Sequence, residues 1–442
     1  MKAYKSIYRK RHCPNPCLIK LLWQALLVII FLNGCGASQP HVADNPASQR
    51  FRDETLLPKQ SSSDRQAIFF RADQDALPDL VVLNEAAPGK PQLQIFINHG
   101  KKGFQWKSPG RWIEELKAPI LSLTAADLNR DGGDDLILVM EKSGRVSTQI
   151  LFNTKKGYFY AKDKEGFYPL WPGIDKVISI DLDQDGDKDL FYFGQMVLDA
   201  NGKPSSYQTR VLINDGAGRL EDLTALLLPR LPAGIRDASF ADFDDDGYKD
   251  LFMAVDFNKN LFFHNQGGTQ FIEMGQALGM QNDEQNDMGA AVGDVDNDGD
   301  LDLFVGGRQV PGKYGHPAES YLLRNDGGKF TDVTQEILPE FSKLGMVSDA
   351  VWGDIDGDQD QDLILAGEWM PITVYKNDNG KLTDNTAALG LENTTGWWNR
   401  IQLVDLDNDG DQDLYVGNDF GKNCLYRNDG GAFTDVAGEA GG

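Results

Sequence analysis

The chain has 442 residues, with 43 basic and 67 acidic side chains and a formal net charge of −24. Nucleic acid and anionic lipid are poor targets for so acidic a chain, because both carry negative charge themselves. Hydrophobic residues make up 41% of the sequence, which is enough to build a core.

The first 34 residues are typical of an export signal. Six basic side chains and no acidic one occur in residues 1–20, and the apolar run LLWQALLVIIFLNGC follows. That run is too short for a comfortable membrane span. Residues 32–35 resemble the lipobox of bacterial lipoproteins, which implies a lipid on Cys35 and an anchor in a membrane, expected to be the outer membrane. A signal anchor with an incidental Cys35 is the alternative. Residues 35–49 predict a flexible tether.

Acidic loops recur along the rest of the chain. In DVDNDGDLDL (294–303), aspartates occupy positions one, three, five and nine of the loop and glycine occupies position six. Ca²⁺ takes six to eight oxygen ligands, which alternate carboxylates in a tight turn supply. An Asx turn without metal is the alternative. The expected Ca²⁺ ligands of the five intact loops are Asp127, Asn129, Asp131, Asp135, Asp181, Asp183, Asp185, Asp189, Asp242, Asp244, Asp246, Asp250, Asp294, Asp296, Asp298, Asp302, Asp405, Asp407, Asp409 and Asp413.

Two further loops are imperfect. One has Gln359 where the glycine should be, and we still expect Ca²⁺ there. The other begins with Arg71, whose fixed positive charge at the first ligand position opposes metal binding. The acidic residues of these loops are Asp354, Asp356, Asp358 and Asp362 in the first, and Asp73, Asp75 and Asp79 in the second.

The loops mark a repeat. They begin at residues 71, 127, 181, 242, 294, 354 and 405, and their spacing is 51 to 61 residues. Each loop is followed by two apolar runs and a turn led by asparagine, such as RNDGG, which favours a β-hairpin. Four short strands are expected per unit. The sevenfold recurrence predicts an all-β fold over residues 50–442, a seven-bladed β-propeller of four-stranded antiparallel blades with Ca²⁺-binding loops between the first and second strands.

These motifs carry a resemblance to a known family. From about residue 66 to 442, the chain resembles the FG-GAP/VCBS repeat proteins with integrin-α-type propellers, and its later part is similar to the ASPIC/UnbV and cartilage-acidic-protein group. The resemblance rests on residues 302–334, 362–386 and 396–431. It implies a Ca²⁺-binding propeller that acts in ligand binding, adhesion or scaffolding, although a fold alone does not dictate a function.

The sequence leaves the closure of the ring open. Residues 50–58, RFRDETLLP, are similar to the expected fourth strand KFTDVTQEILP (329–339). Either this copy completes the last blade, or residues 433–436 pair with their own hairpin and the copy is loose. The second is favoured, because a local hairpin closes at little entropic cost.

Strand order places the connections between second and third strands on the face opposite the acidic loops. Residues suited to bind a glycan or a surface protein gather there, by stacking and fixed polar contacts. Tryptophans that only fill gaps between sheets are the alternative. The candidates are Arg308, Tyr314, Glu368, Trp369, Trp397, Trp398 and Asn418.

Signatures of hydrolases, zinc proteases and P-loop enzymes are absent from the sequence, which favours a non-enzymatic module. The alternative is a Ca²⁺-dependent polysaccharide lyase that uses Arg308, Lys313 or Tyr314. With Cys35 lipidated, Cys424 would be the one cysteine left in the mature chain, and it is expected to be a small core residue.

Overall fold

The computed structural model describes residues 64–75, 77–84, 92–100, 104–108, 118–161, 167–170, 172–195, 197, 209–229, 231, 234–255, 259–275, 286–310, 313–418 and 423–436. The predicted signal, the tether, Cys35 and the strand-like residues 50–58 lie outside the described residues.

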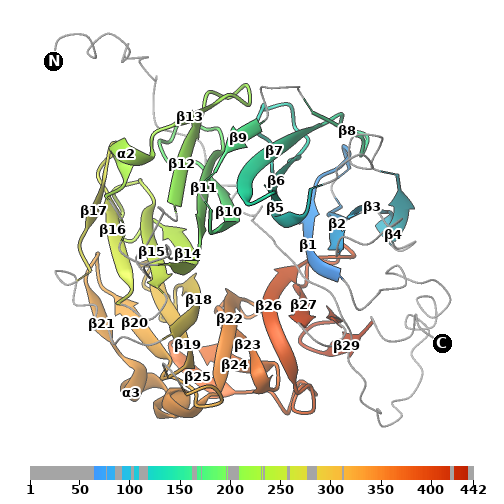
Figure 1. Cartoon of the computed structure of the whole chain (residues 1–442). Coiled ribbons are helices and arrows are strands. Elements are labelled where there is room, and N and C mark those ends of the chain that lie inside the picture. The colour runs from blue at the N-terminus through green and yellow to red at the C-terminus, as the bar shows by residue number, and fades with distance from the viewer. Residues whose placement is uncertain are drawn as a thin grey trace, which may run out of the picture.

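The described residues form consecutive antiparallel units of four strands, here called blades 1 to 7, which follow one another around a ring (Figure 1). The predicted all-β fold of four-stranded antiparallel sheets is confirmed. Blade 1 contains β1 (Asp64–Phe70), β2 (Asp79–Asn84), β3 (Leu93–Asn98) and β4 (Phe104–Lys107). Blade 2 contains β5 (Ile120–Ala126), β6 (Asp135–Lys142), β7 (Arg145–Asn153) and β8 (Phe159–Tyr160), with β9 (Phe167–Pro169) added beside β7. Blade 3 contains β10 (Ile174–Ile180), β11 (Asp189–Gly194), β12 (Thr209–Asn214) and β13 (Leu220–Asp222).

The second half of the chain repeats this arrangement. Blade 4 contains β14 (Ile235–Ala241), β15 (Asp250–Val255), β16 (Leu261–Asn265) and β17 (Phe271–Glu273), and blade 5 contains β18 (Asn286–Gly293), β19 (Asp302–Gln309), β20 (Tyr321–Asn325) and β21 (Phe330–Asp332). Blade 6 contains β22 (Met346–Gly353), β23 (Asp362–Met370), β24 (Thr373–Asp378) and β25 (Lys381–Asp384). Blade 7 contains β26 (Gly396–Val404), β27 (Asp413–Asn418), β28 (Cys424–Asn428) and β29 (Phe433–Asp435).

Helical segments are short. They are α2 (Thr224–Leu227), α3 (Thr334–Ile337) and the 3₁₀ turn η5 (Pro339–Lys343). In the part of the chain that the structure describes, no helix has the length and apolar character needed to cross a membrane.

The hydrophobic core is divided among the junctions between blades. Each junction has a cluster of buried side chains from the two blades that meet there. Strand residues of blade 4, such as Phe252, pack with Leu303 and Val305 of blade 5. The strands are buried on both faces, which explains why the second strand of each unit is an almost continuous apolar run.

The ring closes by packing between its first and last blades. Phe69 and Val82 of blade 1 share a buried cluster with Val404 and Tyr415 of blade 7. Strand β29 pairs with β28 in a local hairpin, as the second closure alternative predicts. The described part of the last blade thus takes its fourth strand from residues that follow its third.

Among the described strands, one pairing crosses the junction between two blades. The end of β23 extends beyond its own blade, where Glu368 lies opposite Trp397 and Met370 lies opposite Gly396 of β26. Blades 6 and 7 therefore form one continuous eight-stranded sheet. Nothing in the repeat pattern predicts this pairing, because that pattern describes each blade separately.

A buried aspartate and a buried asparagine fasten each blade to its neighbour; we call this pair the Asp–Asn lock. The aspartate begins the second strand and accepts two backbone N–H bonds, one from loop position two and one from the asparagine that ends the third strand. The asparagine side chain donates to the position-two carbonyl of the preceding blade's loop. The pairs are Asp79–Asn98, Asp135–Asn153, Asp189–Asn214, Asp250–Asn265, Asp302–Asn325, Asp362–Asn377 and Asp413–Asn428.

At the closing junction, the lock joins residues that are far apart in the sequence. The Asn98 amide donates to the Leu406 carbonyl of blade 7 at 3.2 Å and to the Pro78 carbonyl at 3.1 Å, and its Oδ1 accepts the Gly100 N–H at 2.9 Å. The ring is therefore closed by the same hydrogen bond that joins every other pair of blades.

We expect Asn98→Ala to lower the free energy of unfolding by about 2–3 kcal/mol, because it leaves buried backbone groups without partners. Urea denaturation measures this change. Asn393→Ala is the control, since that exposed side chain donates a hydrogen bond to its neighbour Glu392, and it should stay within about 0.5 kcal/mol of the parent. Equal stability of the two variants would show that the lock does not hold the ring.

Candidate functional site

The acidic loops all begin where a first strand ends, and their aspartates are held by backbone N–H groups. In the loop at 294, the Asp298 and Gly299 N–H groups donate to the two oxygens of Asp294 at 3.2 and 3.0 Å. The Asp300 N–H donates to Asp298 at 2.9 Å. These are the bonds of Asx turns, so the carboxylates are oriented before any cation binds.

The ninth-position aspartates are the most buried of the acidic residues. Asp135 and Asp302 are both fully buried, and burial raises the pKa of each to about 7, although their backbone hydrogen bonds act in the opposite direction. The neighbouring loop aspartates add to the rise. A cation in the loop would offset both costs, because it favours the charged form of every carboxylate near it.

Five loops contain a carboxylate oxygen that is buried and has no hydrogen-bond partner in the described residues. An unpaired buried oxygen of this kind is costly unless a cation takes its lone pair. Burial and the neighbouring aspartates raise the pKa of three of these residues, Asp242, Asp296 and Asp407. The unpaired atoms are Oδ1 of Asp181, Asp242, Asp296, Asp356 and Asp407.

The donor set fits Ca²⁺. Carboxylate oxygens from positions one, three and nine lie within 4.8 Å of one another in the loops at 181, 294 and 354. Hard oxygen donors from one flexible loop are what Ca²⁺ takes. The loop at 127 differs from the five loops with an unpaired oxygen. Both oxygens of Asp127 accept backbone N–H bonds, and Lys155 lies 3.8 Å from Asp131, so this described loop has no buried carboxylate oxygen without a partner.

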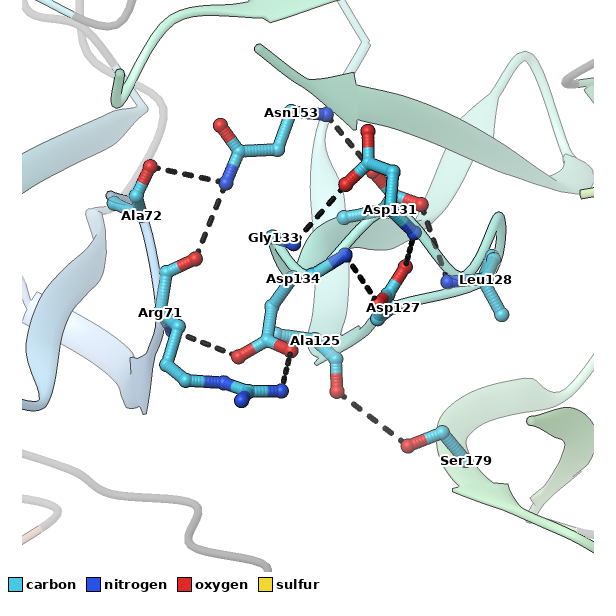
Figure 2. A network of polar contacts seen from close by, with 12 residues as sticks. Arg71, Ala72, Ala125, Asp127, Leu128, Asp131, Gly133, Asp134, Asn153 and Ser179 are labelled. Carbon is cyan, nitrogen blue, oxygen red and sulfur yellow. Dashed lines mark hydrogen bonds and ion pairs between the residues drawn. The ribbon is translucent and has the colours of Figure 1, made fainter. Parts of the chain in front are cut away.

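The degenerate first loop uses its arginine elsewhere. The Arg71 side chain is 57% exposed and lies 3.3 Å from Oδ1 of Asp134, in the loop of blade 2, while its backbone N–H donates to the same carboxylate (Figure 2). The same figure shows the Asn153 amide reaching the Arg71 and Ala72 carbonyls. Arg71 is thus a bridge between blades.

The loop at 354 keeps the shape of the others despite its missing glycine. Gln359 has φ of +78°, in the left-handed region, and its N–H donates to Asp354 at 2.9 Å as the glycine N–H does elsewhere. The Lys376 ammonium contacts Asp356 and lies 3.0 Å from Asp358. The positive charge of a lysine side chain therefore already lies beside the acidic residues of this loop.

On the opposite face, five of the predicted ligand-binding residues come together across three blades. Arg308 Nε and the Tyr314 hydroxyl donate to the two oxygens of Glu368, each at 2.6 Å. Burial works against ionisation of Glu368, but hydrogen bonds from Tyr314, Trp397 and Arg308 hold its pKa below the usual value. The carboxylate is thus a fixed anchor at the centre of the group.

Aromatic rings cover this anchor. The Trp369 and Trp397 rings lie with their centroids 4.4 Å apart, tilted by 47°. Trp369 is 61% exposed and Tyr314 is 56% exposed. Trp369 has φ of +63°, a strained backbone for a bulky residue, and such strain is found at ligand clamps. We call Arg308, Tyr314, Glu368, Trp369 and Trp397 the aromatic cluster.

The other two candidates do not join it. Trp398 is 1% exposed, and its indole N–H donates to the Thr394 carbonyl at 2.8 Å, so it is a core residue that seals the junction of blades 6 and 7. Asn418 lies opposite Trp398 in the sheet, and its backbone N–H donates to Asn423. Cys424 is buried in β28, as expected of a core residue.

Two sets of functional residues were not recognised from the sequence. The asparagines of the Asp–Asn locks were treated only as turn residues, although an asparagine at the same place in all seven repeats was the available signal. The residues before them, such as His264 and Lys376, were missed because nothing in the sequence indicates that they reach the acidic loops.

Comparison with known proteins identifies the repeat. A family model described as FG-GAP-like repeat matches residues 72–138, 181–253, 242–305 and 354–416, more than half of the chain. Cartilage acidic protein 1 of Mus musculus is 29% identical over 118 residues, and that of Homo sapiens is 27% identical over 134 residues. The matched stretches cover 26% and 30% of this chain but only 17% and 19% of those relatives.

Among solved structures, the chain is similar to BBS1N, crystallised in complex with ARL6DN and soaked with mercury or lead. The sequence identities are 13% and 12%, and the TM-scores are 0.43 and 0.42. The alignments cover 85% of this chain and 93% of each BBS1N chain.

The left-handed backbone of Gln359 generates a prediction about stability. Gln359→Gly should raise the free energy of unfolding by about 1 kcal/mol, because glycine adopts positive φ without strain and the replaced side chain is exposed. The matched reverse change is Gly299→Gln, where φ is +98° and no atom lies within 4 Å of an added Cβ. It should be destabilising by a similar amount. Denaturation curves in which Gln359→Gly is the less stable protein would contradict this account.

Proposed function

The chain belongs to the family of FG-GAP-like repeat proteins, and from that premise we propose that it is a calcium-stabilised, ligand-binding module anchored by lipid at the cell envelope. The family and the relationship to cartilage acidic protein suggest ligand binding or adhesion. Calcium, export and the lipid anchor go beyond the family assignment and are parts of the proposal.

The aromatic cluster is the observation that carries the binding role. Clustered tryptophan and tyrosine rings that are exposed to solvent are unfavourable in free energy, and such clusters mark binding sites. Here they surround a carboxylate that is already held by Arg308 and Tyr314, so the group keeps its shape without a ligand. A preformed site loses less entropy on binding.

The ligand class we propose is a glycan. The faces of sugar rings stack on tryptophan and tyrosine, and their hydroxyl groups take hydrogen bonds from fixed polar side chains. Trp369 and Trp397 would supply the stacking surface, and Arg308 and Glu368 the polar contacts. A surface protein that presents an aromatic or sugar-like group is the second partner class.

Calcium is supported by the unpaired carboxylate oxygens and by the close grouping of loop aspartates. In the loops that begin with aspartate, positions one, three and five would hold the ion, with the ninth-position aspartate shared between the ion and the Asp–Asn lock. The bound ion would neutralise the loop and keep its carboxylates charged.

Export supplies the environment that these loops need. The basic and apolar start of the sequence and the lipobox-like residues before Cys35 support passage across a membrane and lipid attachment. Extracellular modules bind Ca²⁺ with dissociation constants of about 10⁻⁴–10⁻³ M, which suits a calcium-rich exterior.

Calcium removal is the first test. At free Ca²⁺ ten times the dissociation constant, each filled loop adds about 1.4 kcal/mol, so excess EDTA should lower the melting temperature by at least about 5 °C, and added Ca²⁺ should restore it. Asp407→Ala should lower the melting temperature in Ca²⁺ and matter less in EDTA. Glu392→Ala, an exposed change outside the loops, is the control. An identical melting curve in EDTA would refute the calcium role.

Binding is tested with a glycan array probed by the purified chain in Ca²⁺. Trp369→Ala should weaken binding of the retained glycan about tenfold, since stacking on one ring is worth about 1 kcal/mol or more. Trp106→Ala is the matched control, because that tryptophan is 54% exposed on β4 of another blade. Absence of any bound glycan would overturn the ligand class. Release of unsaturated product from acidic polysaccharides would instead favour the lyase alternative.

A further inference from the structure

The acidic loops differ in the residue that precedes the lock asparagine at the end of the third strand. In blades 1 to 3 this residue is apolar, and in blades 4 to 7 it is basic or an imidazole. In chain order these residues are Ile97, Phe152, Ile213, His264, Arg324, Lys376 and Arg427. Histidine is the only one of these side chains whose nitrogen can bind a metal in its neutral form. Blade 4 is therefore the only blade with a metal-binding nitrogen at this position of the sequence.

His264 points into the loop of its own blade. Its Nδ1 lies 3.1 Å from Oδ2 of Asp244 and 3.1 Å from Oδ1 of Asp250. The ligand atoms of these three residues lie within 4.8 Å of one another, as do those of Asp242, Asp244 and Asp246. The imidazole thus joins the carboxylates at the place where the cation of the other loops would bind.

A further donor in this loop lacks a partner. Oδ1 of Asp242 is buried and has no hydrogen-bond partner among the residues that the structure describes, while its Oδ2 accepts the Gly247 N–H at 2.9 Å. Asp250 is 1% exposed on its side chain, whereas His264 is 25% exposed, so the imidazole edge lies toward the open side of the loop. The described donors thus form two groups that share Asp244: one with Asp250 and His264, and one with Asp242 and Asp246.

This donor set selects a different ion from that of the other loops. Ca²⁺ takes oxygen ligands, and imidazole nitrogen is favoured by Zn²⁺, Co²⁺, Ni²⁺ and Cu²⁺. Zn²⁺ binds well in sites of one or more histidines with aspartates. We propose that the loop at 242–250 is a transition-metal site of the Zn²⁺ class, with His264 Nδ1, Asp244 and Asp250 as ligands.

The inference goes beyond the proposed function, because it assigns a second kind of metal to one blade. The two proposals are independent of each other. The loop at 242–250 could bind Zn²⁺ even if the other loops bound no Ca²⁺, and the other loops could bind Ca²⁺ even if this loop bound no Zn²⁺. The competing structural explanation is a protonated His264 that forms ion pairs with Asp244 and Asp250 and needs no metal.

The test is calorimetric titration of the full chain with Zn²⁺ in the presence of excess Ca²⁺, supported by the visible absorption of Co²⁺ bound in its place. We expect one Zn²⁺ per chain and a Co²⁺ spectrum typical of a nitrogen-containing site. His264→Ile, which copies the residue of blade 3, should weaken Zn²⁺ binding by at least about 100-fold and remove the Co²⁺ signal. His316→Ala, an exposed histidine of the opposite face, should leave both unchanged.

His264→Gln is the second variant, in case the isoleucine disturbs the loop, and a melting curve in Ca²⁺ shows whether each variant is folded. A folded His264→Gln that keeps parental Zn²⁺ affinity would overturn the proposal. So would a parent protein that binds no Zn²⁺ in excess Ca²⁺, because the histidine would then serve only the ion pairs. Loss of Zn²⁺ binding in His316→Ala alone would also overturn it.

Discussion

The structure depends on a buried carboxylate at the start of the second strand of every blade. A carboxylate removed from water must be fully bonded, and this one accepts N–H groups from its own loop and from the end of the third strand. The asparagine at that point then reaches the preceding blade. Because one small group of polar atoms fixes the loop, the hairpin and the neighbour together, the blades are held in register around the ring. The hydrophobic clusters supply most of the burial, and the polar group fixes how each blade is positioned against its neighbour.

This arrangement concentrates negative charge on one face. The ninth-position aspartates are buried beside other acidic groups of their own loops, and burial raises their pKa values, Asp413 to about 7 and Asp362 to about 6. The chain offsets that charge by different means in different blades. Arg71 crosses to the loop of blade 2, and Lys376 reaches the loop of blade 6. The loops that look equivalent in the sequence are therefore electrostatically distinct.

Much of this fold could be predicted from the sequence, because the features that specify it are local. The spacing of the acidic loops and the asparagine-led turns report the four strands of each unit directly. The contacts between blades could not be predicted in the same way. Arg308 and Glu368 are 60 residues apart and meet only because two blades pack side by side. The extension of β23 onto β26 likewise depends on the geometry of one junction.

The tryptophan pair at 397 and 398 is a case in which local reasoning could have gone further. Successive side chains in a strand point to opposite faces, so neighbouring tryptophans in β26 cannot both line one surface. Trp398 is in the core and Trp397 stacks with Trp369. The periodicity of the strand implies this division, whereas the choice of which ring faces outward required the register of the sheet.

The two faces of the ring carry separate tasks, and this separation has an evolutionary consequence. The Asp–Asn locks that fasten one blade to the next lie at the end with the acidic loops, while the connections between second and third strands lie at the other end. Those connections already differ greatly within the chain, from residues 310–320 after β19 to residues 371–372 after β23. New specificities can therefore arise by exchange or lengthening of these segments while the fastening end is left intact, much as variable loops diversify on a constant framework.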